Sequence, residues 1–227
     1  LETRSDEAVF RAAVGQDPSL ADVVRMVHPK PATAERKALY GYLLGREYDT
    51  ARLPQVAQQL QAFKANATED VPNVPFQMLT SLKLGQREWA EVARNASWQT
   101  TRMNLNTFAR HGVFELEGMT SLVAEKLSNA ERVAHAKVFP YQLMTAYASC
   151  ADGVPVVVRE ALQAAMDLAL ANVPSIEGKV YVLPDVSGSM SSPVTGLRAG
   201  ATSVVRCIDV AGLMAAAVLQ RNQEAEV

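Results

Sequence analysis

The strongest constraint on the fold is the spacing of apolar residues from residue 1 to about residue 174. Apolar side chains recur there with a helical period, and glycine or proline interrupts the pattern at short intervals. We expect helices near residues 5–14, 18–27, 32–45, 52–65, 75–84, 86–97, 100–111, 117–127, 130–150 and 154–172. Short helices with short loops suit either a bundle or a stacked solenoid of the HEAT type, and the pattern leaves both open.

A different pattern follows near the end of the chain. The apolar run that begins at Val180 is rich in β-branched and aromatic residues, which predicts a strand that stops at Pro184. Asp185, Ser187 and Ser189 come directly after it at alternate positions. Their hard oxygen atoms suit Mg²⁺, or else Mn²⁺ or Ca²⁺, so the stretch predicts a divalent cation site. The alternative is a hydroxyl-rich turn that satisfies its own backbone.

A long apolar helix is expected after this turn, over residues 201–222. Arg206 and Asp209 in its first half favour burial within protein over a membrane span. One strand and one helix cannot close a parallel sheet, because such sheets need several strands covered on both faces. We therefore expect the chain to be a fragment of a longer protein.

Two other stretches carry candidate binding residues. In the first, an apolar helix from Ser19 ends at His28, Pro29, Lys30 and Pro31. Cations are favoured at a helix C-terminus, so a simple helix cap is one interpretation. The other is a phosphate or base contact, with Lys30 as the charge and His28 as a donor or stacking ring.

The second stretch, residues 93–114, contains Arg94, Arg102, Arg110 and His111 without a carboxylate. Tryptophan, phenylalanine and asparagine side chains lie between these cations, a mixture typical of single-stranded RNA recognition. In the alternative interpretation the aromatic residues are core and the arginines are solvated.

Charge and cysteine content restrict the function classes. The formal net charge of the 227 residues is -2, so RNA binding would have to come from a local patch. Cys150 and Cys207 lie in apolar contexts far apart and predict reduced core thiols in a cytoplasmic protein. The sequence has no segment typical of a signal peptide or membrane span, so we expect no membrane partner.

The order of these pieces resembles the Ro autoantigen family. The matching segments are Asp22–Pro31 (DVVRMVHPKP), Val138–Met144 (VFPYQLM) and Pro184–Met190 (PDVSGSM), and residues 104–114 (NLNTFARHGVF) look like the bacterial branch. The resemblance implies a mainly α fold with a TROVE module of HEAT-like helical repeats, curved into a ring or arc, over residues 1–174. The first strand and helix of an α/β von Willebrand factor A domain would follow over residues 175–227.

The resemblance also implies function. Members bind small structured non-coding RNAs (Y RNAs) and the single-stranded ends of misfolded RNAs. The family's RNA-contacting histidine would be His28, with Lys30 beside it, and the metal ligands of its von Willebrand A domain would include Asp185, Ser187 and Ser189. The remaining metal ligands would lie beyond Val227.

We therefore expect an RNA-binding scaffold for RNA quality control, not an enzyme, with a ribonuclease or another protein as a further partner. No triad-like or metal-binding spacing joins the three histidines, His28, His111 and His135, to a nucleophile. The alternatives are a metal-dependent protein-interaction module that uses the edge at Asp185, and a structural assembly protein. Measurement of RNA affinity across a salt series distinguishes the RNA-binding scaffold from the protein-interaction module.

Overall fold

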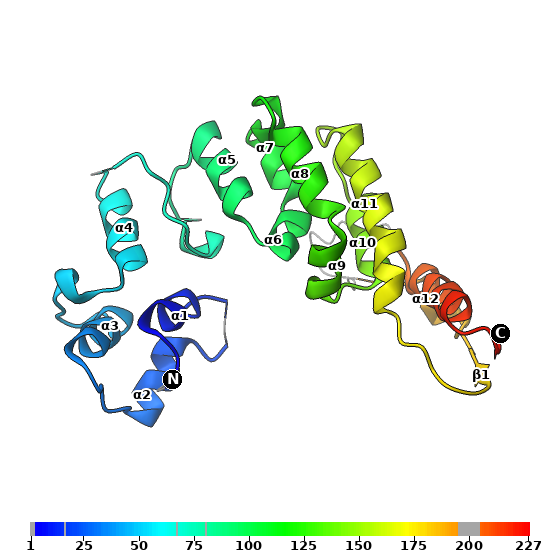
Figure 1. The fold of residues 1–227 in the computed structure, drawn as a ribbon, viewed down its shortest axis with the longest axis horizontal. Helices are drawn as coiled ribbons and strands as arrows, with labels where there is room; N and C mark the ends of the chain where they lie inside the picture. Colours follow the sequence, from blue (N-terminus) through cyan, green and yellow to red (C-terminus); the bar gives the residue numbers. More distant parts are fainter. Residues whose placement is uncertain (1–2, 16, 67, 80, 195–204) are drawn as a thin grey trace. The chain divides into compact units, whose positions relative to one another are not determined.

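The computed structural model describes residues 3–15, 17–66, 68–79, 81–194 and 205–227 (Figure 1). The chain divides into two compact units, Leu1–Asn95 and Ala96–Val227. The domain boundary that we predicted after residue 174 falls inside the second unit and stays a prediction, as does the arrangement of the helices as curved repeats.

The first unit is helical. Its α-helices are α1 (Asp6–Arg11), α2 (Leu20–Val27), α3 (Ala34–Leu44), α4 (Gln55–Lys64) and α5 (Gln86–Asn95), with short 3₁₀ helices η1 (Thr50–Arg52) and η2 (Phe76–Met78). The prediction of a helix over residues 75–84 was wrong. Among the described residues of this range only η2 forms, because Leu79 N donates to Phe76 O and Leu82 N to Leu79 O, which are tight turns rather than continued helix.

Side-chain caps explain where several helices begin. The Ser19 hydroxyl accepts a hydrogen bond from Asp22 N at 3.2 Å, and the Thr33 hydroxyl accepts one from Arg36 N at 3.0 Å. Ser97 caps α6 in the same way, with Thr100 N as the donor at 3.1 Å. Each cap satisfies a backbone donor that the first helical turn leaves unpaired and typically stabilises the helix by about 1 kcal/mol.

The second unit is also mainly helical. Its α-helices are α6 (Trp98–Met103), α7 (Leu105–Arg110), α8 (Met119–Leu127), α9 (Ala130–Ala136), α10 (Pro140–Ala148), α11 (Val156–Ala169) and α12 (Cys207–Arg221), with 3₁₀ helices η3 (Val113–Glu115), η4 (Leu170–Asn172) and η5 (Gly188–Ser191). Two predicted helices are each divided in two. Residues 100–111 break at Asn104, and residues 130–150 break at Lys137, whose φ of 48° is left-handed.

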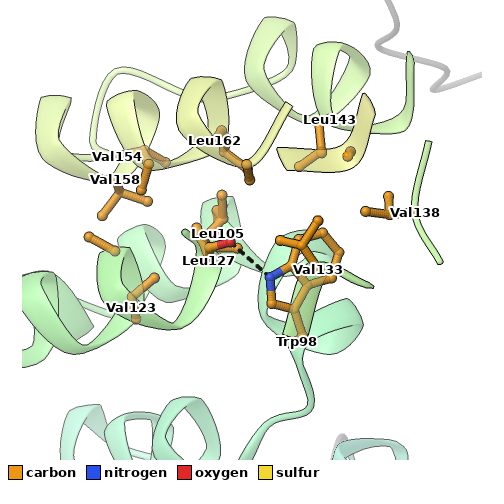
Figure 2. Close-up of a cluster of buried hydrophobic side chains, with 14 residues drawn as sticks. Trp98, Leu105, Val123, Leu127, Val133, Val138, Leu143, Val154, Val158 and Leu162 are labelled. Carbon is orange, nitrogen blue, oxygen red and sulfur yellow. Dashed lines mark hydrogen bonds between the residues drawn. The ribbon is translucent and has the colours of Figure 1, made fainter. Parts of the chain in front are cut away.

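The core of the second unit lies among α6 to α11 (Figure 2). Helix α11 packs against both α8 and α10. Leu162, Leu127 and Leu143 are fully buried there, and Trp98 is 5% exposed. The indole nitrogen of Trp98 donates to the carbonyl oxygen of Leu127 at 2.9 Å, so its polar atom is satisfied inside the core.

Two short strands lie at the end of the chain. β1 (Val180–Tyr181) pairs in parallel with β2 (Ala225–Glu226), and η5 and α12 lie between them in the chain. The strand expected from Val180 is therefore present but only two residues long. The start of the expected 201–222 helix, residues 201–204, lies outside the described residues, and α12 begins at Cys207.

Cys150 and Cys207 are free, half-buried thiols. Across the part of the chain that the structure describes, no helix is both long and apolar enough to cross a membrane.

Candidate nucleic-acid interface

The end of α2 sets the position of His28. The residue has a left-handed backbone (φ 48°, ψ 53°), and its N–H donates to Val24 O at 3.0 Å, which ends the helix. A non-glycine residue in this conformation is uncommon, so the turn is defined by its surroundings rather than by a glycine. The ring is exposed, and its Nδ1 lies 3.3 Å from Met26 O. The helix-cap interpretation and an exposed contact residue are thus compatible.

Lys30 lies two residues later but faces a different part of the first unit. His28 borders a cavity of about 390 Å³, and Lys30 borders a second cavity of about 470 Å³. Tyr40 of α3, which is 6% exposed, lines both cavities and so forms part of a wall common to the two. The motif that looked like one contact site in the sequence therefore presents the side chains of His28 and Lys30 to two neighbouring cavities.

Arg94 lies at the end of α5 in the same unit. Its side chain is exposed, and its Nε is 3.4 Å from a carboxylate oxygen of Glu91 one turn earlier. Such a solvent-exposed pair contributes little to stability.

Arg102 has a structural role in the second unit. Its Nη1 donates to the carbonyl oxygen of Gln142 at 2.8 Å, which links α6 to α10. The side chain is half-buried, and this burial lowers the pKa of the guanidinium, although Tyr141 opposes the shift. The residue remains charged at any physiological pH.

Arg110 and His111 lie where α7 ends. Arg110 is exposed, whereas His111 is half-buried and its N–H donates to Thr107 O at 3.1 Å. The predicted RNA-binding residues thus divide between the units: His28, Lys30 and Arg94 lie in the first, and Arg102, Arg110 and His111 in the second.

The sequence analysis missed two cations that the fold places near His28. Lys37 of α3 and Arg46, just after α3, are exposed and line the His28 cavity. A helical projection could have placed Lys37 on the same helix as Tyr40, but only the packing of α2 against α3 brings either cation to His28.

The predicted cation site begins after β1 and ends in η5, which contains Ser189. Ser187 N donates to Asp185 Oδ1 at 2.8 Å, and the hydroxyls of Ser187 and Ser189 are 3.0 Å apart. Hydrogen bonds from the Ser187 backbone and then its hydroxyl lower the pKa of the Asp185 carboxyl. All three side chains are exposed. The structure thus brings the three predicted oxygen donors together, in the turn geometry that the alternative interpretation also predicted.

These donors fit a hard divalent cation. Mg²⁺ is commonly held by one or two carboxylates together with neutral oxygen atoms and water, which matches one carboxylate and two hydroxyls. The described residues contain no cluster of three or more His, Cys, Asp or Glu side chains that could hold a metal ion. A site at Asp185 would therefore depend on the serine hydroxyls.

Comparison with known proteins finds similarity among solved structures. No protein-family model matches the chain, and no curated protein sequence matches it significantly. The crystal structure of the Deinococcus radiodurans Ro (RSR) protein is similar, with a TM-score of 0.63 and 22% sequence identity. The match covers 99% of this chain and 49% of that protein, so the chain spans about half of its length. The chain thus has a Ro-like, mainly helical fold.

Proposed function

We propose that this chain is an RNA-binding scaffold that acts in RNA quality control in the cytoplasm. Its ligands would be a small structured non-coding RNA of the Y type and the single-stranded ends of misfolded RNAs. The main support is that His28 and Lys30 are exposed at the end of α2, where His28 has a left-handed backbone. The fold around them is Ro-like.

The mechanism requires no chemical step. Exposed cations neutralise phosphates and release condensed counterions, which provides affinity without sequence preference. Lys30, Arg94 and Arg110 are exposed and can serve in this way. Side chains with directional hydrogen-bonding groups, such as His28, would fix the position of the RNA on the helical surface.

Binding of a hairpin RNA with a single-stranded 3′ end tests the proposal. Filter binding from 50 to 200 mM salt should give a log-log slope of about -0.9 for each duplex phosphate contacted. The paired substitutions His28→Ala and Lys30→Ala should weaken binding by about tenfold, close to the 1.4 kcal/mol of one charge-assisted contact. Arg110→Ala should make the slope shallower by about one contact.

Lys64→Ala is the matched control, because Lys64 is exposed at the end of α4 and borders neither cavity at α3. Its affinity should equal that of the unmodified chain. If the chain does not bind the hairpin RNA at 50 mM salt, the proposal is wrong.

A second proposed function is a metal-dependent protein contact at the turn after β1 that contains Asp185, Ser187 and Ser189. It is favoured by the clustering of Asp185, Ser187 and Ser189: the Ser187 hydroxyl lies 3.0 Å from the Ser189 hydroxyl and also forms a hydrogen bond with the Asp185 carboxylate. A divalent cation held there would keep open positions for an acidic side chain of a partner protein, such as a ribonuclease. Calorimetric Mg²⁺ binding that Asp185→Ala abolishes would support this function, and RNA binding would not depend on it.

A further inference from the structure

The cavity beside His28 has the size and lining of a small-molecule site. Its volume of about 390 Å³ is near the lower end of the range of ~300–1,000 Å³ for ligand pockets. It lies wholly within the first unit, between the end of α2 and the outer part of α3. A site of this size accepts one compact, rigid group.

The wall of the cavity is mainly apolar. Val24 and Tyr40 are buried at 4% and 6% exposure, and Leu44 is half-buried beside them. Pro29 and Pro31 contribute rigid rings from the chain after α2. A flat apolar group gains from burial against such a wall and orders few side chains when it enters, because proline and the buried residues are already fixed.

The rim of the cavity is positively charged. Lys37, Arg46 and Arg25 line it, against the single carboxylate of Glu47. Arg25 already pairs with Asp22 at 2.8 Å, so Lys37 and Arg46 are the cations most accessible to a ligand. The backbone N–H of Arg46 donates to Gly41 O at 2.9 Å, which fixes the position from which the Arg46 side chain extends, just after the end of α3. The occupant should therefore be an anion.

His28 adds a directional group. When its Nδ1 donates to Met26 O at 3.3 Å, Nε2 of the neutral ring is a hydrogen-bond acceptor. A nucleobase amino group or a ribose hydroxyl is a suitable donor for it.

From these features we infer that the cavity seats one unpaired nucleotide of the bound RNA, with its base against Val24, Tyr40 and Leu44 and its phosphate at Lys37 and Arg46. The inference rests on the proposed RNA-binding function and specifies how that site distinguishes unpaired from paired RNA. A base within a duplex is covered by its neighbours and cannot enter an apolar cavity of this kind, whereas an unpaired base can.

The test uses the full chain and two fluorescein-labelled probes of twelve nucleotides: oligouridylate, and an abasic strand with the same phosphates. We expect the abasic strand to bind at least tenfold more weakly. The paired substitutions Lys37→Ala and Arg46→Ala should reduce the salt slope for oligouridylate by about 0.7, the value for loss of one single-strand phosphate contact. Lys64→Ala should change neither value. Oligouridylate that contains 4-thiouridine should cross-link to peptides of α2 and α3.

The outcomes separate this inference from the proposed function. If hairpin RNA binds as proposed but the abasic and base-containing strands bind equally, the nucleotide pocket is wrong and RNA binding stands. If neither strand nor the hairpin binds, both are wrong. If hexaglutamate displaces oligouridylate and uridine 5′-monophosphate does not, the cavity is a site for acidic peptides and the inference is overturned.

Discussion

Lys126 offers a direct test of the second unit's packing. This residue of α8 is 8% exposed, and its ammonium group donates to the carbonyl oxygen of Ala96 at 3.0 Å. Burial, and to a lesser degree the positive charge of Arg132, lowers the pKa of Lys126 from 10.5 to about 8. Folding therefore buries a cation whose charged form is disfavoured relative to the unfolded chain.

The sign of the pH effect follows from this difference. Below pH 8 Lys126 is protonated in both states, so the folded state carries the full penalty. Above pH 8 the folded state releases the proton while the unfolded state keeps it until about pH 10.5, so stability rises with pH in this window. The full difference is worth ~3 kcal/mol at 1.36 kcal/mol per pH unit, and about 2 kcal/mol of it develops between pH 7 and pH 9.5.

Urea unfolding at pH 7 and pH 9.5 measures this contribution. The reference protein carries only Trp89→Phe, so that fluorescence comes from Trp98 in the core of the second unit, and the test protein carries Lys126→Met in addition. Between the two pH values, the free energy of unfolding with Lys126 present should rise by about 2 kcal/mol relative to the variant. Lys137→Met, which removes an exposed charge in the same unit, should follow the unmodified chain.

A buried Lys126 ammonium group is contradicted if the free energies of unfolding of the reference protein and of the Lys126→Met protein change equally with pH, within about 0.5 kcal/mol, the ordinary size of surface effects. In that case water would surround the Lys126 ammonium group in the folded state, and its hydrogen bond to the Ala96 carbonyl would not persist.

Three further outcomes follow from single side chains. Leu162→Ala removes a fully buried side chain and should lower the free energy of unfolding by about 3 kcal/mol in the same urea assay; a loss below 1 kcal/mol would contradict the packed core. Asn106→Ala removes two hydrogen bonds, to Ser149 O at 2.7 Å and from Ala151 N at 2.8 Å, and should cost about 2 kcal/mol; an unchanged urea midpoint would show that water replaces both. Asp185→Ala should abolish calorimetric Mg²⁺ binding with an unchanged urea midpoint, because the side chain is exposed; retained binding would place the ion elsewhere.

Helices were easier to predict than their interruptions. Apolar periodicity located α2, α3, α5, α8 and α11 within a few residues, because each buries one face. It could not show the break at Lys137, since a left-handed backbone at a lysine has no sequence signature comparable to glycine. It also failed for residues 75–84, where burial of Leu79 is achieved by a 3₁₀ turn and a loop. Periodicity reports which side chains face the core, not whether the hydrogen-bond ladder continues.

The candidate site was predictable only where its residues are close in sequence. His28 and Lys30 could be selected from one motif, as could the three oxygen donors after β1. Lys37 and Arg46 could not, because their approach to His28 depends on how α2 packs against α3. A contact between two helices depends on side-chain volumes and crossing angle, which a linear pattern does not contain.

The arginines of residues 93–114 show why residue type alone does not assign a binding role. In the sequence Arg102 and Arg110 were equivalent, yet Arg102 donates to a backbone carbonyl of α10 and is half-buried, whereas Arg110 is exposed. Moving Arg102 onto a phosphate would leave the Gln142 carbonyl without this donor, so part of any gain from the phosphate would be lost. An exposed arginine forfeits only its contacts with water. Under the proposed function, Arg110 rather than Arg102 therefore makes a phosphate contact, and Arg102 fixes α6 against α10.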